Sequence, residues 1–528
     1  MATMSLPTGA AGMQRTDVYR YRYLIAFAVA LASVLELVDT SIVNVAIPHM
    51  MGELGATLDE IAWVSTGYIV ANVIILPMTS WLSDRFGRRH YYTGSIILFT
   101  IASFLCGNAS SLEMLVAARV LQGIGGGALI STAQAILFDV FPLEERAKGQ
   151  AIFGMSVMVG PTLGPTLGGW ITDNYSWPWI FYINLPLGAL AAFLTWRLVP
   201  EPAHEAHQTE KVDWLGLALL IAGIGALQVM LERGESKDWF DSREIIAEAI
   251  IACICIVLFI WHELTTEHPV VNLRVLKNRQ LTVGVVFGAI LGFALYSSVF
   301  ALPVFLQTEL GYTAWDTGKV ILPGAIASAV AMGMMGRLAS KVDARVLITA
   351  GVALFMVSMW YHYHFTLETG MHDLFWPMVL RGFGIGLVFV PLTAATVADL
   401  KPHLIPQGTG LFNLSRQLGG SFGIAITATL LSRFTDHARE GMLPHVTMYD
   451  APTRSWLAAM TSYFARLGGT VAEAEHRAMA LLNVQLGRQA AVFAFEKVFL
   501  IMGVTFVAAL PLLLLFRTGR ARGGGMAH

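Results

Sequence analysis

Three ionisable residues lie inside long apolar runs of the sequence. Glu36 and Asp39 stand in the run 23–47, and Arg119 stands in the run 113–137. A charged side chain at the centre of a bilayer costs about 2.5–3.5 kcal/mol on insertion scales, so such positions indicate function. Desolvation raises a carboxyl pKa and a nearby guanidinium lowers it. The chemistry that this combination predicts is reversible proton binding.

The spacing and depth of these residues predict which of them meet. Glu36 and Asp39 are three residues apart, which places them on one helix face. At the helical rise, Asp39 lies roughly 25 Å from Arg22, and Arg119 lies roughly 10 Å below the opposite boundary, at a matching depth. We expect Asp39 to be the main proton-coupling carboxylate and Arg119 its partner, with a static ion pair between two helices as the alternative. For Glu36 two interpretations are open: a role in proton coupling or cation binding, and a structural polar contact.

The composition explains why these residues must sit in a membrane. The chain has 528 residues, of which 55% are hydrophobic and 13% charged, and its mean hydropathy is +0.61. These values lie outside the soluble range. The net charge of −2 and the absence of a long basic tract give no sign of nucleic-acid binding. No G-x-x-x-x-G-K-[ST] string is present, so ATP is not the expected energy source. No nucleophile and base have credible spacing for an enzyme, and the histidines and cysteines have none for a metal.

Apolar runs of roughly 20 residues, the length that spans a bilayer, recur along the chain. They predict fourteen helices near 23–47, 61–81, 91–109, 113–137, 152–172, 177–198, 213–231, 245–262, 281–302, 316–336, 346–363, 375–397, 407–430 and 497–516. An even number places both termini on one side. Lys and Arg gather in the segments that are cytoplasmic if the N-terminus is inside, so both termini are expected in the cytoplasm. The polar start of the chain does not resemble a cleaved signal.

The sequence also contains a degenerate internal repeat at an offset of about 256–262 residues. ELGAT at 53–57 matches ELGYT at 309–313, and SWLSDRFGRR at 80–89 matches GRLASKVDAR at 336–345. Two six-helix bundles in the same orientation are a recurrent transporter plan. The expected organisation is a cytoplasmic segment (1–22), a first bundle (23–200), a linker with two inserted helices (201–275), a second bundle (276–516) with an extracytoplasmic loop (431–496), and a cytoplasmic tail (517–528).

Five strings carry a family resemblance that covers about residues 20 to 516. They are LVDTSIVNVAIP (37–48), SWLSDRFGRR (80–89), RVLQGIGGG (119–127), GPTLGPTLGG (160–169) and WIFYINLPLG (179–188). Together they resemble the major facilitator superfamily, in its fourteen-helix drug/proton antiporter branch typified by EmrB and QacA, and closer to EmrB. The resemblance implies an all-α membrane fold and proton-coupled multidrug export without a cofactor. A proton-coupled symporter, a specific metabolite exporter and a non-transporting scaffold are the alternatives.

Two of these strings predict gating residues. The loop string offers Asp84, Arg85, Gly87 and Arg88, with a tight turn at Gly87 and a latch at Asp84; positive-inside topology is the plainer explanation. Its first residue, Ser80, departs from the family's usual Gly. The other string predicts a bending or sealing helix, for which pure packing is the alternative. Its candidate residues are Gly160, Gly164, Pro165, Gly168 and Gly169.

Polar residues within the other predicted spans are candidates for substrate binding. An interhelical hydrogen bond is the alternative for each one. Arg416 and Gln417 are the strongest, because a midplane arginine must meet either substrate or a carboxylate such as Glu36. The full set is Asn44, Gln122, Asn184, Arg381, Asn413, Arg416 and Gln417.

The segment 431–496 is too polar to span a membrane and has apolar residues at helical spacing, which predicts amphipathic helices outside it. The resemblance implies the inner membrane of a bacterium. It also implies a periplasmic membrane-fusion adaptor and an outer-membrane channel as partners.

Overall fold

The structure, a computed structural model, describes residues 15–142, 145–201, 212–339, 341–468 and 470–516. Helices make up this part of the chain, and it contains no strand. In chain order they are α1 (Arg15–Leu54), α2 (Leu58–Ile61), α3 (Trp63–Ile75), α4 (Thr79–Phe86), α5 (Arg88–Gly107), α6 (Leu112–Gly126), α7 (Leu129–Val140), α8 (Arg146–Asn174), α9 (Trp179–Tyr182), α10 (Asn184–Leu198), α11 (Trp214–Arg233), α12 (Arg243–Thr265), α13 (Arg279–Val304), α14 (Ala314–Leu338), α15 (Ala344–His362), α16 (Met371–Val397), α17 (Ile405–Met442), α18 (Ala451–Arg466) and α19 (Val471–Ala508).

Helical structure is present at all fourteen predicted positions. Three predicted spans consist of consecutive pieces: α2 to α4 through the turn Leu76–Met78, α6 with α7, and α9 with α10. Among the described residues, twelve helical stretches are long and apolar enough to cross a membrane. The predicted positions outside these twelve are α5 and α17, which both carry arginines and other polar residues. The fold is therefore compatible with fourteen spans, and that number stays a prediction.

The two parts of the chain that carry the repeat each form a bundle, and they meet along α8 and α14. In the first, α1 packs on α8 and α3 on α6; in the second, α13 packs on α17 and α14 on α16. Glycines allow α8 and α14 to approach closely at both ends, because Gly336 faces Ala151 and Gly169 faces Ala314. The inserted helix α11 packs against α12 and also touches α3 and α17. It therefore contacts both bundles.

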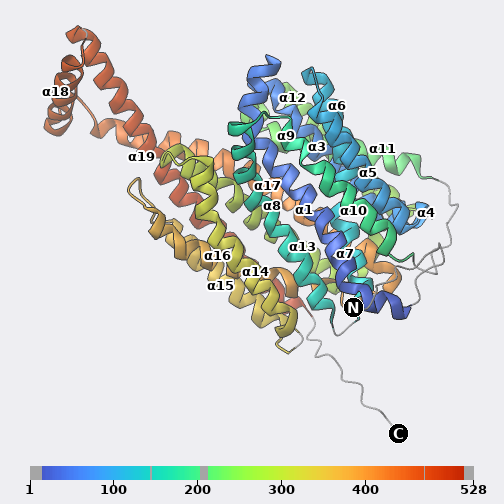
Figure 1. The fold of residues 1–528 in the computed structure, drawn as a ribbon. Coiled ribbons are helices and arrows are strands. Elements are labelled where there is room, and N and C mark those ends of the chain that lie inside the picture. Colours follow the sequence, from blue (N-terminus) through green and yellow to red (C-terminus); the bar gives the residue numbers. More distant parts are fainter. Residues whose placement is uncertain (1–14, 143–144, 202–211, 340, 469, 517–528) are drawn as a thin grey trace, which may run out of the picture.

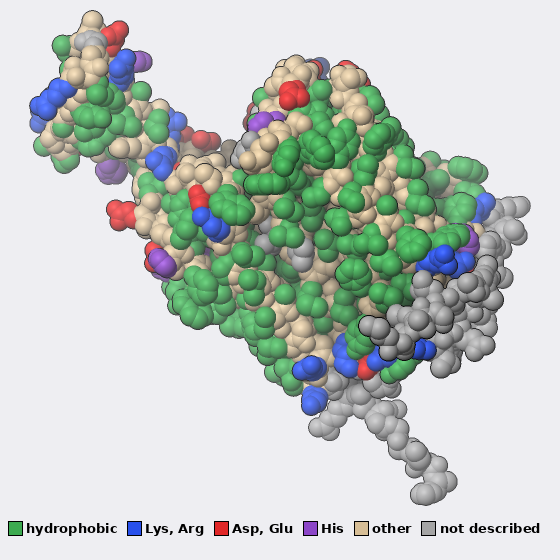
Figure 2. All heavy atoms as spheres, in the orientation of Figure 1, with side chains coloured by type: hydrophobic (Ala, Val, Ile, Leu, Met, Phe, Trp, Pro, Cys, Tyr) green, Lys and Arg blue, Asp and Glu red, His purple; other side chains and the backbone are tan. Residues whose placement is uncertain are grey.

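The outer surface fits a lipid environment. Hydrophobic side chains cover the middle of the face in Figure 2, while charged side chains lie mainly toward its upper and lower margins and on the arm at the upper left. Exposed large residues such as Phe27, Ile101, Phe193, Ile254 and Val330 contribute to this apolar surface. Such an extent of exposed apolar surface is unusual for a soluble monomer and is expected for a protein that spans a bilayer.

The predicted segment 431–496 is helical and forms an arm. Figure 1 shows α18 and the first part of α19 projecting away from the bundle at the upper left. The last span, predicted to begin at 497, is part of a helix that begins at Val471, because the amphipathic segment continues into the apolar one without a proline. The ends of the described chain lie together at the lower side, opposite the arm (Figure 1).

Candidate functional site

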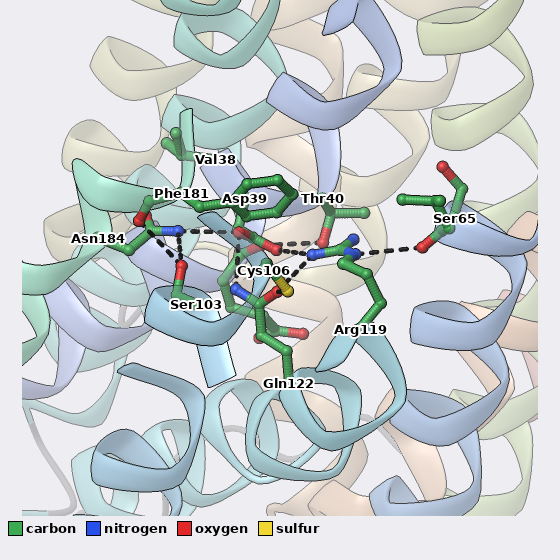
Figure 3. A network of polar contacts seen from close by, with 12 residues as sticks. Val38, Asp39, Thr40, Ser65, Ser103, Cys106, Arg119, Gln122, Phe181 and Asn184 are labelled. Atoms are coloured by element: carbon green, nitrogen blue, oxygen red, sulfur yellow. Dashed lines mark hydrogen bonds and ion pairs between the residues drawn. The ribbon is translucent and has the colours of Figure 1, made fainter. Parts of the chain in front are cut away.

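Asp39 lies at the centre of the first bundle and is surrounded by donors. Arg119 Nη1 donates to its Oδ2 at 2.6 Å, while Gln122 Nε2 and Asn184 Nδ2 each donate to its Oδ1 at 2.8 Å. Figure 3 shows these side chains converging from α1, α6 and α10. Asp39 is 0% exposed and Arg119 is 1% exposed, so the predicted ion pair is present and is buried.

Several contacts hold Arg119 in place independently of Asp39. Its Nε donates to the Val64 carbonyl at 3.1 Å, and its Nη1 also donates to Gln122 Oε1 at 2.7 Å. Its guanidinium carbon lies 4.1 Å from the ring centroid of Tyr68. A buried arginine is stabilised by such a combination of hydrogen bonds and aromatic contact. Arg119 therefore has partners that remain when Asp39 takes up a proton.

Glu36, one helical turn from Asp39, occupies a separate polar site. It is 4% exposed, and its Oε1 accepts a hydrogen bond from Asn72 Nδ2 at 2.8 Å. Its other oxygen, Oε2, is buried without a hydrogen-bond partner. Arg416 is near enough for the two charges to interact, but no ion pair joins them among the described residues. Asn72 binds the Glu36 carboxyl group in this state, and the expectation that Arg416 meets either substrate or a carboxylate such as Glu36 stays a prediction.

The predicted substrate-binding residues fall into different places. Gln122 and Asn184 belong to the cluster around Asp39, and Asn184 also donates to Ser103 Oγ at 3.0 Å. Asn44 is exposed and accepts a hydrogen bond from Ser65 Oγ at 3.2 Å. Arg381, in the second bundle, is buried and donates to the Ser298 carbonyl at 3.3 Å. These four residues therefore do not form one site.

Asn413, Arg416 and Gln417 lie together on α17, facing the boundary between the bundles. Arg416 Nη1 donates to the Tyr296 hydroxyl at 3.0 Å, and that hydroxyl donates to Gln417 Oε1 at 3.2 Å. Asn413 Nδ2 reaches the first bundle and donates to Gln134 Oε1 at 2.6 Å. Arg416 is 1% exposed, and within this group the buried hydrogen bond from Asn413 to Gln134 connects the two bundles.

The loop string forms the tight turn that it predicts. Gly87 has φ +81°, a conformation that favours glycine. Arg88 forms an ion pair with Asp139 of α7, and Arg85 lies over the ring of Trp81 at 5.7 Å. A cavity of about 190 Å³ opens beside the turn. It is lined by Pro77, Ser80, Trp81, Asp84, Arg85, Pro269, Val270, Val271, Asn272, Gln407 and Leu411.

The glycines of α8 allow it to lie directly on α1. A Cβ atom at Gly160 would overlap Leu37, and one at Gly164 would overlap Ser41. Gly168 faces Ile42, whose Cγ1 would lie 2.9 Å from an added Cβ. Ser41 Oγ also donates to the Gly160 carbonyl at 2.9 Å. The helix continues through Pro165, while Gly169 faces α14 rather than α1.

Comparison with known proteins decides the family. The model for the Major Facilitator Superfamily matches residues 29–424, which is most of the chain. The chain belongs to the major facilitator superfamily. It is accordingly a multi-pass membrane transporter and not an enzyme.

Related proteins span nearly the whole chain. It is 35% identical to the Multidrug export protein EmrB of Escherichia coli strain K12, over 96% of this chain and 98% of that one. It is 34% identical to the Fatty acid resistance protein FarB of Neisseria gonorrhoeae, over 95% and 97%. Among solved structures, the human organic anion transporter MFSD10 (TETRAN) matches with a TM-score of 0.57 and 14% identity, over 92% of this chain and 99% of that one. That last match supports the fold alone.

Two residues of this transporter's central site were missed by the sequence analysis. Tyr68 lies against Arg119, and Asn72 binds Glu36. Both stand on α3, one helical turn apart. A signal existed, since an asparagine inside an apolar span usually forms an interhelical hydrogen bond. Nothing in the sequence indicated that its partner would be Glu36.

Proposed function

We propose that this transporter exports hydrophobic or amphipathic small molecules in exchange for protons. The observation that carries the proposal is the buried ion pair of Asp39 and Arg119, at 2.6 Å. Protonation of Asp39 would remove the charge that Arg119 faces, and the two protonation states would then favour different helix arrangements. A ligand can shift such an equilibrium only through a difference in affinity between the states. In this proposal the ligand is the proton, which would bind Asp39 with different affinity in the two helix arrangements.

The movement coupled to the proton is a rocking of the two bundles, residues 23–200 and 276–516. Their contacts along α8 and α14 involve small residues, such as Gly318 facing Thr166. Such contacts can slide without breaking ion pairs. The turn at Gly87 and the packing of α8 on α1 would act as gates at this boundary. Alternating exposure of a midplane site between two similar bundles is the general mechanism of such folds.

The substrate site lies at the boundary of the bundles and includes Asn413, Arg416 and Gln417. The names of two related proteins refer to multidrug export and to fatty acid resistance. A fatty acid is a long apolar chain with one carboxyl group. A buried site with few polar groups among apolar side chains suits such molecules. Proton symport and export of one specific metabolite remain the competing functions.

The membrane placement proposed is the bacterial inner membrane, with both termini in the cytoplasm. The charge distribution supports this orientation, because Arg20, Arg22 and the segment 85–89 would be cytoplasmic. The arm of α18 and α19 would then lie in the periplasm. In that position the arm would be available to a membrane-fusion adaptor that leads to an outer-membrane channel.

The test uses protein in liposomes preloaded with an amphipathic fluorescent dye, with a pH gradient imposed across the membrane. We expect gradient-driven dye movement in the wild type, and its loss in Asp39→Asn. Glu113→Gln, which removes an exposed carboxylate at the start of α6, is the control and should behave as the wild type. Full gradient-driven movement in Asp39→Asn would refute the role of Asp39. Dye and protons moving in the same direction would establish symport instead.

A further inference from the structure

Tyr68 is a buried tyrosine that lies near both acidic sites and has no role in the mechanism above. It is 1% exposed and comes from α3, between the α1 carboxylates and α6. Its ring faces the Arg119 guanidinium at 4.1 Å. Electrostatic interactions link it to Glu36 and to Asp39. It therefore stands where the two acidic sites meet.

The hydroxyl of Tyr68 lies next to the group that binds Glu36. A Cβ atom at Gly126 would lie 2.6 Å from Tyr68 Oη and 3.2 Å from Asn72 Nδ2. The Tyr68 hydroxyl and the Asn72 amide therefore both lie next to Gly126, in space that a side chain at this position would occupy. Asn72 Nδ2 in turn donates to Glu36 Oε1 at 2.8 Å. Any side chain at position 126 would displace this arrangement.

Two polar atoms in this region are buried without a hydrogen-bond partner, and they are chemically complementary. One is Tyr68 Oη, a donor, and the other is Glu36 Oε2, an acceptor. The Thr40 side chain is also near enough to interact with the Tyr68 hydroxyl, and the Thr40 hydroxyl itself donates to the Glu36 carbonyl at 2.9 Å. An unsatisfied buried polar group costs about 1–3 kcal/mol. A bond between these two atoms would satisfy both.

We propose that Tyr68 joins the two acidic sites: its ring holds Arg119 against Asp39, and its hydroxyl, unbonded in this structure, forms a hydrogen bond with the free oxygen of Glu36 once a movement of α3 against α1 brings the two atoms together. The hydroxyl donates to Glu36 when that carboxyl is ionised and accepts from it when it is protonated. Tyr68 is therefore a positioning residue for both carboxyls. The proposal rests on the proposed proton-coupled function, and it adds a second carboxyl that responds to pH.

Other ionisable groups near Glu36 also influence its titration, and the test must distinguish the effect of Tyr68 from theirs. With Tyr68 on α3, these groups are Asp39 on the same helix, Arg416 on α17 and Tyr92 on α5. Tyr92 donates its hydroxyl hydrogen to backbone carbonyls, including that of Val29 at 3.3 Å. The hydroxyl hydrogen of Tyr92 is therefore already used in hydrogen bonds. The hydroxyl of Tyr68 has no hydrogen-bond partner.

The hydroxyl is tested by infrared spectroscopy of the purified transporter over a pH series, without substrate. The carboxyl band that disappears in Glu36→Gln reports the protonation of Glu36. In Tyr68→Phe we expect this band to persist to higher pH by about one unit, because the ionised carboxyl has lost a donor. Tyr182→Phe removes a hydroxyl that donates to the Gly107 carbonyl and to neither acid, and should leave the titration in place.

An unshifted titration in Tyr68→Phe would overturn the hydroxyl's role. This readout needs no transport, so it stands or fails separately from the proposed exchange of protons for substrate. The ring is tested by dye movement in liposomes, where Tyr68→Leu should lose at least tenfold more activity than Tyr68→Phe. Equal activity of the two variants would overturn the ring's role.

Discussion

At the scale of single residues, the centre of the molecule is a charge pair that neutral amides surround. Gln122 is bonded to both members of the pair, since it donates to Asp39 and accepts from Arg119. The sequence predicted the pair correctly, because helical rise gives the depth of each residue. It could not assign Gln122 and Asn184 to the pair, because depth does not determine which way a side chain points around its helix.

Removing one charge of this pair should be worse for stability than removing both. In Arg119→Gln the Asp39 carboxylate is left in a dry site without a cation, a situation that typically costs about 3–5 kcal/mol. In the double variant Asp39→Asn with Arg119→Gln, no charge is left. We expect the apparent melting temperature in detergent to fall most in Arg119→Gln and to recover partly in the double variant. A double variant less stable than Arg119→Gln would contradict this description of the site.

At the scale of helices, the glycines of α8 determine how closely it approaches α1. Their spacing of four residues predicted close packing on a neighbour, and the structure confirms it with Ser41 and Ile42 of α1 on the other side. The sequence could not identify α1 as that neighbour. It also missed the start of α19 at Val471, since a hydropathy pattern reveals where a helix enters lipid but not where it begins.

This packing predicts a sharp contrast between two glycine-to-alanine substitutions. Gly164→Ala would force a methyl group into Ser41 and should destabilise the transporter by about 1–3 kcal/mol, the usual range for overpacking. Gly94→Ala, in α5, meets nothing within 4 Å and should be neutral or slightly stabilising. Thermal unfolding of both variants in detergent measures the difference. Equal melting temperatures would mean that α8 does not pack on α1 in this register.

At the scale of the whole molecule, the repeat predicted two similar bundles, but not how they touch. The Asn413 to Gln134 contact joins residues 279 positions apart. Contacts of this kind depend on the relative orientation of the two bundles, which would change in the proposed rocking. Such contacts leave no periodic pattern in the sequence. The spans of each bundle, by contrast, are visible in the sequence as apolar runs.

Rocking can be stopped by a disulfide between the bundles. An added Cβ at Gly336 of α14 would lie 3.4 Å from the Ala151 Cβ of α8, close to the usual Cβ separation of about 3.5–4.5 Å in a disulfide. With Cys106, Cys253 and Cys255 replaced, Ala151→Cys with Gly336→Cys should cross-link on oxidation and lose dye movement. Reduction should restore it, and each single cysteine should be insensitive to oxidant. Unimpaired transport by the cross-linked protein would rule out rocking at this end of α8 and α14.

The most direct test of proton exchange is proton release from the purified transporter when substrate is added. In weakly buffered detergent solution, addition of an amphipathic cationic dye that the transporter binds should acidify the medium with the wild type. Asp39→Asn should bind the dye and release no proton from this site. Release by Asp39→Asn equal to that of the wild type would contradict the claim that Asp39 exchanges its proton for substrate.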